Sequence, residues 1–295
     1  MDFIRSATML CLDILINHLK KQGIKMVRAI QSFAGLTLLA SACAAQAFPT
    51  QQVVPGGLVI LPLASQEEHR PMAYYAGARV TVVSEGDSWV ALVGIPLDTE
   101  PSLQQLKVNL GGVQQTISFE VQPKHYRTQH LRIKDNNKVE PDEDSSERIV
   151  QEMVLQKRLT KQYTGEVLST EFIRPVAGRD SGRFGLRRIL NGQQRQPHSG
   201  MDIAAATGTP VKVVAPGRVI YTGNLFFSGN VVYVDHGGGL ISMYAHLNQI
   251  NVKNGEVLEQ GDYLGTVGSS GRATGPHLHW SVYLNGTAIN PALFL

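Results

Sequence analysis

The sequence predicts a mainly β protein in which two β-rich parts are joined by a helical segment. Short runs of β-branched and aromatic residues, separated by turn residues, fill positions 54–121 and again positions 172–295. Between them lies a charged stretch with helical periodicity. The chain has 295 residues, 43% of them hydrophobic and 17% charged, which is enough to build more than one core.

Residues 1–47 have the pattern of an export leader. From Met26, a basic residue (Arg28) precedes an apolar stretch and then small residues that end in "AQA" at Ala47, which indicates a secretory signal cut after Ala47. The apolar stretch is too short and too rich in small residues for a membrane span. We expect translation to start at Met26, with an unusually long basic region as the alternative, and the mature protein to be periplasmic or secreted.

Loss of the leader would remove both cysteines and all of the net charge. Cys11 and Cys43 lie within it, so the mature chain would contain no disulfide and no thiol ligand. Lipidation at Cys43, in "LASAC", is an alternative that would tether the protein to a membrane. The remaining chain has equal numbers of basic and acidic residues and lacks a basic run with interleaved aromatics, so we expect no nucleic-acid partner.

The first β-rich part, residues 48–125, is expected to form a small β-sandwich. Its strand candidates are "GLVILPL", "ARVTVV", "WVALVGI", "LKVNL" and "TISFEV", with turn residues such as Gly111-Gly112 between them. It contains no catalytic cluster, and His69 is expected on the surface.

Residues 126–169 are expected to form a linker that contains a helix. Acidic residues in "EPDED" open the helical stretch and basic residues (Lys157, Arg158) close it, as the helix dipole favours. One apolar stripe is predicted to dock on a neighbouring domain: Ile149, Val150, Met153 and Val154.

The second β-rich part, residues 170–295, holds most of the chemistry-bearing side chains. Five of the nine histidines lie here: His198, His236, His246, His277 and His279. His236, in "VDHGGG", occupies turn chemistry and is expected to be structural. Trp280 and Tyr244 are expected to pack beside the site.

Two spacings predict a metal site. His277 and His279, in "GPHLHW", are two apart, so in a strand both point to one face with their Cα atoms roughly 6.5 Å apart. His198 and Asp202 are four apart in a loop that runs into a strand, and an even spacing again favours one face. Two imidazoles and one carboxylate are the ligand set of a catalytic zinc with an open fourth position. Non-haem iron is the alternative, although its histidine and carboxylate usually lie two apart.

His246 and His277 would then lie near the metal without being needed as ligands. A neighbouring imidazole, with a pKa near 6.5, can accept a proton and pass it to a leaving amine. No glutamate adjoins the histidines as in H-E-x-x-H enzymes, so we expect histidine to take that role.

Together these motifs resemble the lysostaphin-type zinc peptidases, also called LytM-like peptidoglycan endopeptidases. Their H-x-x-x-D motif matches His198 to Asp202, their H-x-H motif matches His277 to His279, and "YAHL" carries His246. The resemblance covers about 170–295 and implies one zinc ion on His198, Asp202 and His279. It also implies that His246 and His277 are catalytic.

The resemblance implies an exported zinc endopeptidase that acts on the stem peptides of peptidoglycan. A D-alanyl–diaminopimelate bond is the implied target in a Gram-negative setting, and glycine bridges are the alternative. The front β part is similar to a domain that precedes this module in periplasmic proteins and can restrain it. Some relatives have lost their ligands and activate cell-wall amidases instead. A biotinyl-like carrier is a third possibility, but Lys212 lies between valines rather than in an exposed turn.

Two further features adjoin the predicted site. The loop "GSSGRATG" (268–275) fits a groove wall better than a phosphate cradle, because it lacks the Gly-Lys-[ST] ending. Arg187 and Arg188 could contact substrate carboxylates, although an exposed arginine pair is the simpler interpretation.

Overall fold

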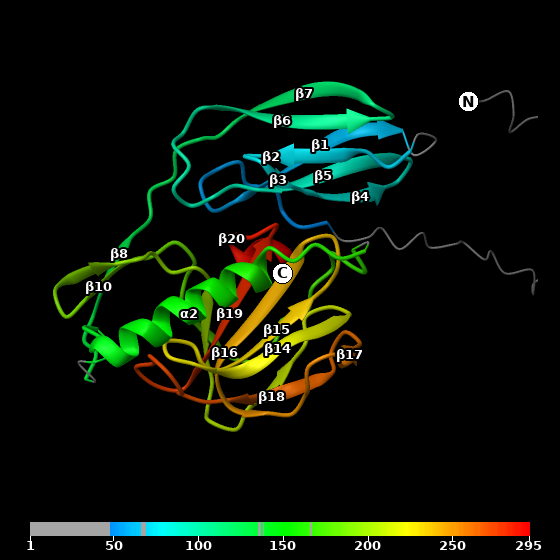
Figure 1. Ribbon diagram of the computed structural model, residues 1–295. Helices are drawn as coiled ribbons and strands as arrows, with labels where there is room; N and C mark the ends of the chain where they lie inside the picture. The colour runs from blue at the N-terminus through cyan, green and yellow to red at the C-terminus, as the bar shows by residue number, and fades with distance from the viewer. Residues whose placement is uncertain (1–47, 66–68, 135–136, 138, 166) are drawn as a thin grey trace, which may run out of the picture. The chain divides into compact units, whose positions relative to one another are not determined.

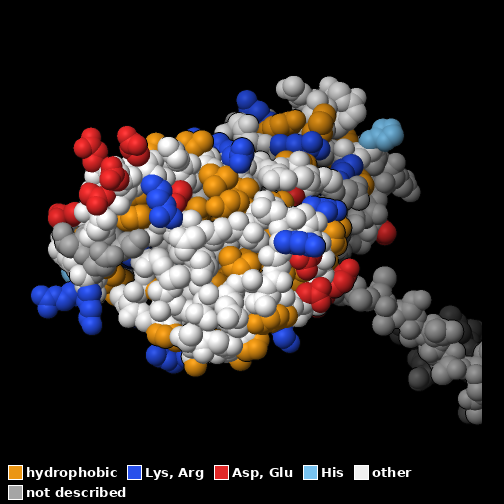
Figure 2. All heavy atoms as spheres, turned by 60° about the horizontal axis from the view of Figure 1, so that its bottom comes forward, with side chains coloured by type: hydrophobic (Ala, Val, Ile, Leu, Met, Phe, Trp, Pro, Cys, Tyr) orange, Lys and Arg blue, Asp and Glu red, His pale blue; other side chains and the backbone are white. Residues whose placement is uncertain are grey.

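The computed structural model describes residues 48–65, 69–134, 137, 139–165 and 167–295 (Figure 1). The expectations for the leader, namely the start at Met26, the cut after Ala47 and lipidation at Cys43, lie outside the described residues. Among the described residues, no helix combines the length and the apolar character needed to cross a bilayer. On the face that Figure 2 shows, Lys and Arg side chains lie singly or in small groups among acidic and uncharged ones.

The first β-rich part contains two antiparallel sheets. One has the strand order β1 (Leu58–Ser65), β5 (Ser88–Gly94), β4 (Thr81–Glu85). The other has the order β3 (Ala78–Arg79), β2 (Met72–Tyr75), β6 (Leu103–Leu110), β7 (Val113–Glu120). Side chains from both sheets, such as Val59 and Leu106, form one core, which is the expected sandwich.

The second β-rich part is built on a ten-stranded sheet. Its main path runs β17 (Val257–Leu258), β14 (Gly217–Leu225), β15 (Gly229–Asp235), β16 (Leu240–Ile250), β19 (His277–Leu284), β12 (Met201–Ala204), β9 (Arg179–Gly182). Three strands pair beside this path: β13 (Pro210–Lys212), β18 (Tyr263–Val267) and β20 (Thr287–Ile289). A 3₁₀ turn, Pro291–Phe294, follows β20. The predicted mainly β fold is confirmed.

Strand β19 separates the core from the site because its side chains alternate between two faces. Leu278, Trp280 and Val282 are fully buried in the main core, together with Tyr244 of β16. Both aromatic residues therefore pack in the interior, as expected. The histidines of β19 lie on the opposite face.

The sheet β1–β5–β4 is covered on both faces. Val59 and Ala91 enter the sandwich core, whereas Leu58 and Leu92 enter the core of the second part. Gly94 of β5 allows this close approach, since an added Cβ would lie 3.0 Å from Ile289. Burial on both faces explains why these strands are continuous apolar runs in the sequence.

The segment between the two β-rich parts contains a helix and a strand. Helix α2 (Glu143–Thr160) begins at Asp142, whose side chain accepts a hydrogen bond from the Ser145 backbone. Strand β8 (Thr128–Leu131), which the sequence analysis did not anticipate, pairs in parallel with β10 (Arg187–Leu190). Strand β10 also pairs with β11 (Gln193–Arg195).

The predicted docking stripe of α2 is wrong. Val150, Met153 and Val154 are 61–67% exposed, and the helix instead packs through Leu155 and Leu159 against β14, β15 and β16. Polar side chains on the packed side rotate the contact away from the apolar stripe. The Glu152 carboxylate accepts a hydrogen bond from the Phe226 backbone at 2.7 Å, and Gln156 accepts one from Tyr233 at 3.2 Å.

This packing predicts a difference between two truncations in one helix. Leu159→Ala should lower the free energy of unfolding by about 2–4 kcal/mol, because it deletes a buried side chain. Val154→Ala, at a position 67% exposed, should change it by less than about 0.5 kcal/mol. Urea denaturation followed by circular dichroism measures both, and equal losses would contradict the packing described here.

Candidate metal centre

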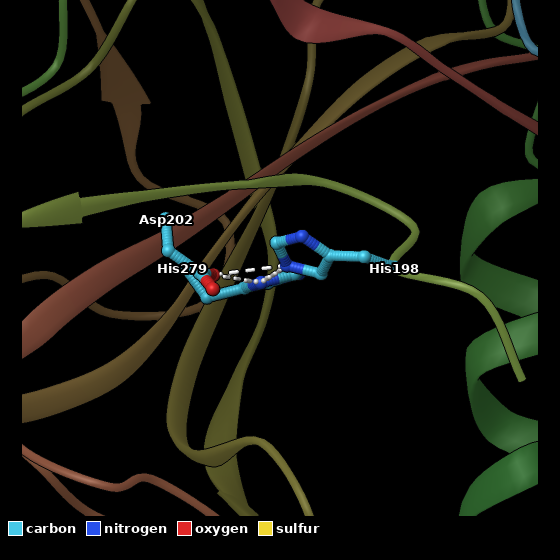
Figure 3. A group of neighbouring side chains, drawn as sticks. All are labelled: His198, Asp202 and His279. Atoms are coloured by element: carbon cyan, nitrogen blue, oxygen red, sulfur yellow. Dashed lines mark hydrogen bonds and ion pairs between the residues drawn. The ribbon is translucent and has the colours of Figure 1, made fainter. Parts of the chain in front are cut away.

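Three side chains from two segments converge on one point (Figure 3). Asp202 of β12 and His279 of β19 are cross-strand partners, so both point to one face. His198 lies in the loop that leads into β12. Asp202 Oδ1 lies 2.8 Å from His279 Nδ1 and 2.9 Å from His198 Nε2, and the two ring nitrogens are 2.9 Å apart.

The surrounding hydrogen bonds leave lone pairs facing this point. His198 Nδ1 lies 2.9 Å from the Arg183 carbonyl, which can only accept, so the ring proton sits on Nδ1 and Nε2 is free to ligate. His279 Nε2 contacts the Ser281 hydroxyl at 2.9 Å. A single proton can bridge only one of the three close contacts, whereas one cation can bind all three atoms. The donor set therefore fits one zinc ion.

Hydrogen bonding to Asp202 and burial of His279 favour the metal-binding protonation state of each of these two groups. His198, Asp202 and His279 are all buried. Burial alone would raise the pKa of Asp202, but hydrogen bonds from the two imidazoles outweigh it and hold that pKa well below the usual range. Burial lowers the pKa of His279 to about 4, so its ring is neutral near pH 7.

A local backbone distortion turns His246 toward this group. His246 has a φ of 61°, in the left-handed region that non-glycine residues rarely adopt, and the β15–β16 ladder shifts register around it. Regular alternation along β16 would point His246 to the other face of the sheet from Ala245, the register partner of His279, and so away from the metal centre. Instead its ring centroid lies 5.9 Å from that of His279 and 4.8 Å from that of His277.

His246 and His277 carry the same tautomer. Each Nδ1 lies 2.8 Å from a backbone carbonyl, that of Ser270 for His246 and that of Gly275 for His277. Each Nε2 is therefore unprotonated when the ring is neutral. Burial, followed by the nearby histidines, lowers the pKa of His246 to about 3. His277 Nε2 lies 3.8 Å from Asp202 Oδ1.

All five residues singled out for metal binding and catalysis thus lie together, and the other two histidines discussed lie elsewhere. His236 is fully buried, with its nitrogens 2.7 Å from the Pro216 carbonyl and from the Ser242 hydroxyl, as a structural role requires. His69 is exposed, as expected.

Two glycines that the sequence analysis did not assign to the site make room for it. A Cβ on Gly200 would lie 2.8 Å from His279 Nε2 and 2.5 Å from the Ser281 hydroxyl. A Cβ on Gly182 would collide with the Asp202 carboxylate. The sequence "PHSGMD" shows that Gly200 lies between His198 and Asp202. A single sequence does not show that this glycine packs closely against β19.

The interpretation of Arg187 and Arg188 as an exposed pair is wrong for Arg188. Its side chain is 20% exposed, and Nη2 lies 3.2 Å from Asp202 Oδ2, so it supports the carboxylate from the side away from the ring nitrogens. Arg187 is exposed. Alternation along β10 turns the two side chains in opposite directions.

A cavity of about 270 Å³ opens beside the donor set. Asp202, His246 and His277 line one part of it, and the loop 268–275 contributes Arg272 and Thr274. The expected groove wall is therefore present. Strand β8 and the residues after it add Gln129, Leu131 and Ile133.

Fold and donor set define a β protein with a zinc site of two imidazoles and one carboxylate, and comparison with known proteins agrees. The model of peptidase family M23 matches residues 196–291, and that of the M23 N-terminal domain matches residues 51–124. A crystal structure of a protein described as a peptidase M23 from Pseudomonas aeruginosa is 38% identical, with a TM-score of 0.70. The match covers 83% of this chain and 95% of that one. The chain belongs to peptidase family M23.

Curated relatives match over shorter segments. The DD-carboxypeptidase/endopeptidase Mpg of Neisseria meningitidis is 43% identical over 116 residues, which cover 39% of this chain and 27% of that protein. The peptidoglycan DD-endopeptidase ShyC of Vibrio cholerae is 38% identical over 131 residues, which cover 43% and 30%. The matched segments thus span less than a third of these relatives.

The tight packing at Gly200 predicts the effect of a single methyl group. Gly200→Ala should weaken zinc binding by about tenfold or more, because the added Cβ displaces His279. Gly275→Ala is the matched control, since no atom lies within 4 Å of its added Cβ. Competition with a chromogenic chelator measures both zinc affinities. An unchanged affinity in Gly200→Ala would contradict the prediction, because it would mean that the added Cβ does not displace His279.

Proposed function

We propose that this protein is an exported zinc endopeptidase that hydrolyses peptide cross-links of peptidoglycan, with the D-alanyl–diaminopimelate bond as its target. The observation that carries the proposal is the convergence of His198, Asp202 and His279 beside a cavity that His246 and His277 also line. The names of Mpg and ShyC support the DD bond and the cell-wall substrate. The signal-like leader supports export.

His198 Nε2, Asp202 Oδ1 and His279 Nδ1 are the proposed zinc ligands. Zinc held there supplies a Lewis acid that polarises the scissile carbonyl and makes water a stronger nucleophile. The Arg183 carbonyl, the Ser281 hydroxyl and the Arg188 guanidinium orient the three ligands. These contacts hold the donor atoms in place, so little reorganisation is needed when substrate binds.

His246 and His277 are the proposed proton carriers. Both are oriented by backbone carbonyls that fix the proton on Nδ1, so each Nε2 can accept a proton from the attacking water. The protonated ring can then donate to the leaving amine or to the developing oxyanion. Burial disfavours the protonated form of His246 and lowers its pKa. The neutral ring is therefore a weak base, and the protonated ring is a strong acid.

Strand β8, which precedes the matched residues 196–291, is proposed to restrain the peptidase activity. Strand β8 pairs along β10 and lines the cavity with Gln129 and Leu131. Its place beside the donor set limits the room for an extended peptide. A non-catalytic activator of amidases is the competing proposal, and the complete donor set disfavours it because such a role needs no metal ligands.

Two substitutions separate metal binding from proton transfer. His279→Ala should lose bound zinc and activity together, because a ligand is removed. His246→Ala should keep zinc and lose about 10²–10⁴ in turnover, as expected for a lost general acid–base group. Metal analysis and chromatography of the muropeptides released from purified sacculi measure the two effects, with His69→Ala as the exposed control.

Wild-type digestion rates in His279→Ala would refute the assignment. Zinc binding by a wild-type protein that releases no fragments from sacculi would favour the non-catalytic role instead.

Removal of the metal gives an independent check. Dialysis against a chelator should abolish digestion of sacculi, and added zinc should restore it. Apparent stability should also fall, by about 4 kcal/mol for a protein that had been held at a thousandfold excess of zinc over its dissociation constant. Calorimetry with and without zinc measures this shift, and identical melting curves would contradict a site that binds the ion in the folded state.

A further inference from the structure

The cavity has a basic side that the proposed chemistry does not use. Arg188 comes from β10, Arg272 from the loop 268–275, and Gln129 from β8, and all three line the same cavity as His246 and His277. Three segments far apart in the sequence thus bring hydrogen-bonding groups to one wall. Asp202 is the single acidic side chain among the described residues that line it.

Two polar atoms in this wall are buried without a protein partner. Among the described residues, Arg188 Nε and Gln129 Oε1 have no hydrogen-bond partner. The two residues are register partners in the parallel β8–β10 pair, so their side chains leave the sheet on the same side. A buried donor or acceptor costs free energy unless a ligand or solvent satisfies it. A carboxylate oxygen can accept from Arg188 Nε, whereas Gln129 Oε1 is an acceptor and needs a donor such as water or its own amide turned round.

Arg272 adds a second positive charge. Its guanidinium carbon lies 4.1 Å from the ring centroid of Phe227, which fixes its direction. Burial, followed by the charges of Arg188 and Arg195, lowers the pKa of Arg272 to about 10, so the side chain stays charged near pH 7. Among the described lining residues, the single carboxylate, that of Asp202, contacts Arg188 and also belongs to the proposed zinc donor set. Both guanidinium groups line the cavity and can attract an anionic ligand.

We propose that Arg188 and Arg272 form a carboxylate-binding subsite next to the metal centre, in a cavity that Gln129 also lines. This inference rests on the proposed peptidase function. Arg188 contacts a proposed zinc ligand directly, so a carboxylate bound there lies close to the scissile amide. The subsite therefore suits substrates in which the carbon bonded to the scissile nitrogen carries a free carboxylate.

The requirement for a free carboxylate next to the scissile nitrogen defines a substrate class. A D-alanyl–diaminopimelate cross-link has such a carboxylate, and so does a terminal D-alanyl-D-alanine peptide. The interior bonds of a glycine bridge have none. The subsite thus favours bonds of the first kind, with the carboxylate fixing the amine side of the scissile bond.

A matched pair of substrates tests the subsite on the full mature chain. Two cross-linked muropeptide dimers differ only in carrying a carboxylate or a carboxamide next to the scissile nitrogen. We expect kcat/KM to be about 10–100-fold higher for the carboxylate form, the range for one charge-assisted hydrogen bond. A D-alanyl-D-alanine pentapeptide and its C-terminal amide form a second arm, which separates a terminal from a cross-linked carboxylate.

Substitutions locate the preference. Arg272→Gln should reduce kcat/KM for the carboxylate dimer by about tenfold or more while changing the carboxamide dimer by less than about threefold. Gln129→Glu keeps the side-chain size and should act in the same direction by repulsion. Arg187→Gln removes a charge from the exposed neighbour of Arg188 and should leave the preference intact. Zinc content is measured for every variant, because Arg188 adjoins Asp202.

Two results would overturn the subsite: equal cleavage of both dimers by the wild type, or an unchanged preference in Arg272→Gln. If the wild type cleaves neither dimer, the peptidase proposal fails. The subsite proposal is then tested separately by ligand binding. In that case, calorimetric titration with N-acetyl-D-alanine and with its amide should show tighter binding of the acid, and Arg272→Gln should remove the difference. Equal binding would reject the subsite.

Discussion

The cross-strand register of β12 and β19 is the constraint on which the site depends. Pairing of Asp202 with His279 places a carboxylate and an imidazole on one face, while their neighbours Ile203 and Leu278 enter the core. A slip of one residue would reverse every side chain of β12, which would bury the carboxylate among aliphatic groups. The same apolar contacts that stabilise the sheet therefore hold the donor set together.

Close packing reinforces this register. Gly200 and Gly182 lie where any side chain would push against His279 or Asp202. Arg188 reaches the second carboxylate oxygen, and the Arg183 carbonyl and the Ser281 hydroxyl orient the rings. The donor atoms are thus restrained from several directions.

Periodicity made much of this predictable from the sequence. Even spacing placed His277 with His279 and His198 with Asp202, and turn-punctuated apolar runs indicated both β-rich parts. The position of His246 could not follow from alternation, because it depends on a left-handed backbone at one residue. The prediction of which face of α2 packs against the sheet failed for a related reason. Three of the four stripe residues are exposed, and Ile149 is half-buried. Glu152 and Gln156 make specific contacts on the other side of the helix, and helical periodicity alone gives no weight to polar contacts.

Pairing of β8 with β10 divides the cavity between parts of the chain that are separate in sequence. The proposed zinc ligands lie within residues 196–291, which the family model matches, whereas Gln129, Leu131 and Arg188 precede that range. The cavity wall thus combines Gln129 and Arg188 from outside the matched range with Arg272 from within it. A chimera that begins at residue 196 would keep the proposed zinc ligands and Arg272, but its new N-terminal partner would supply the opposite wall of the cavity.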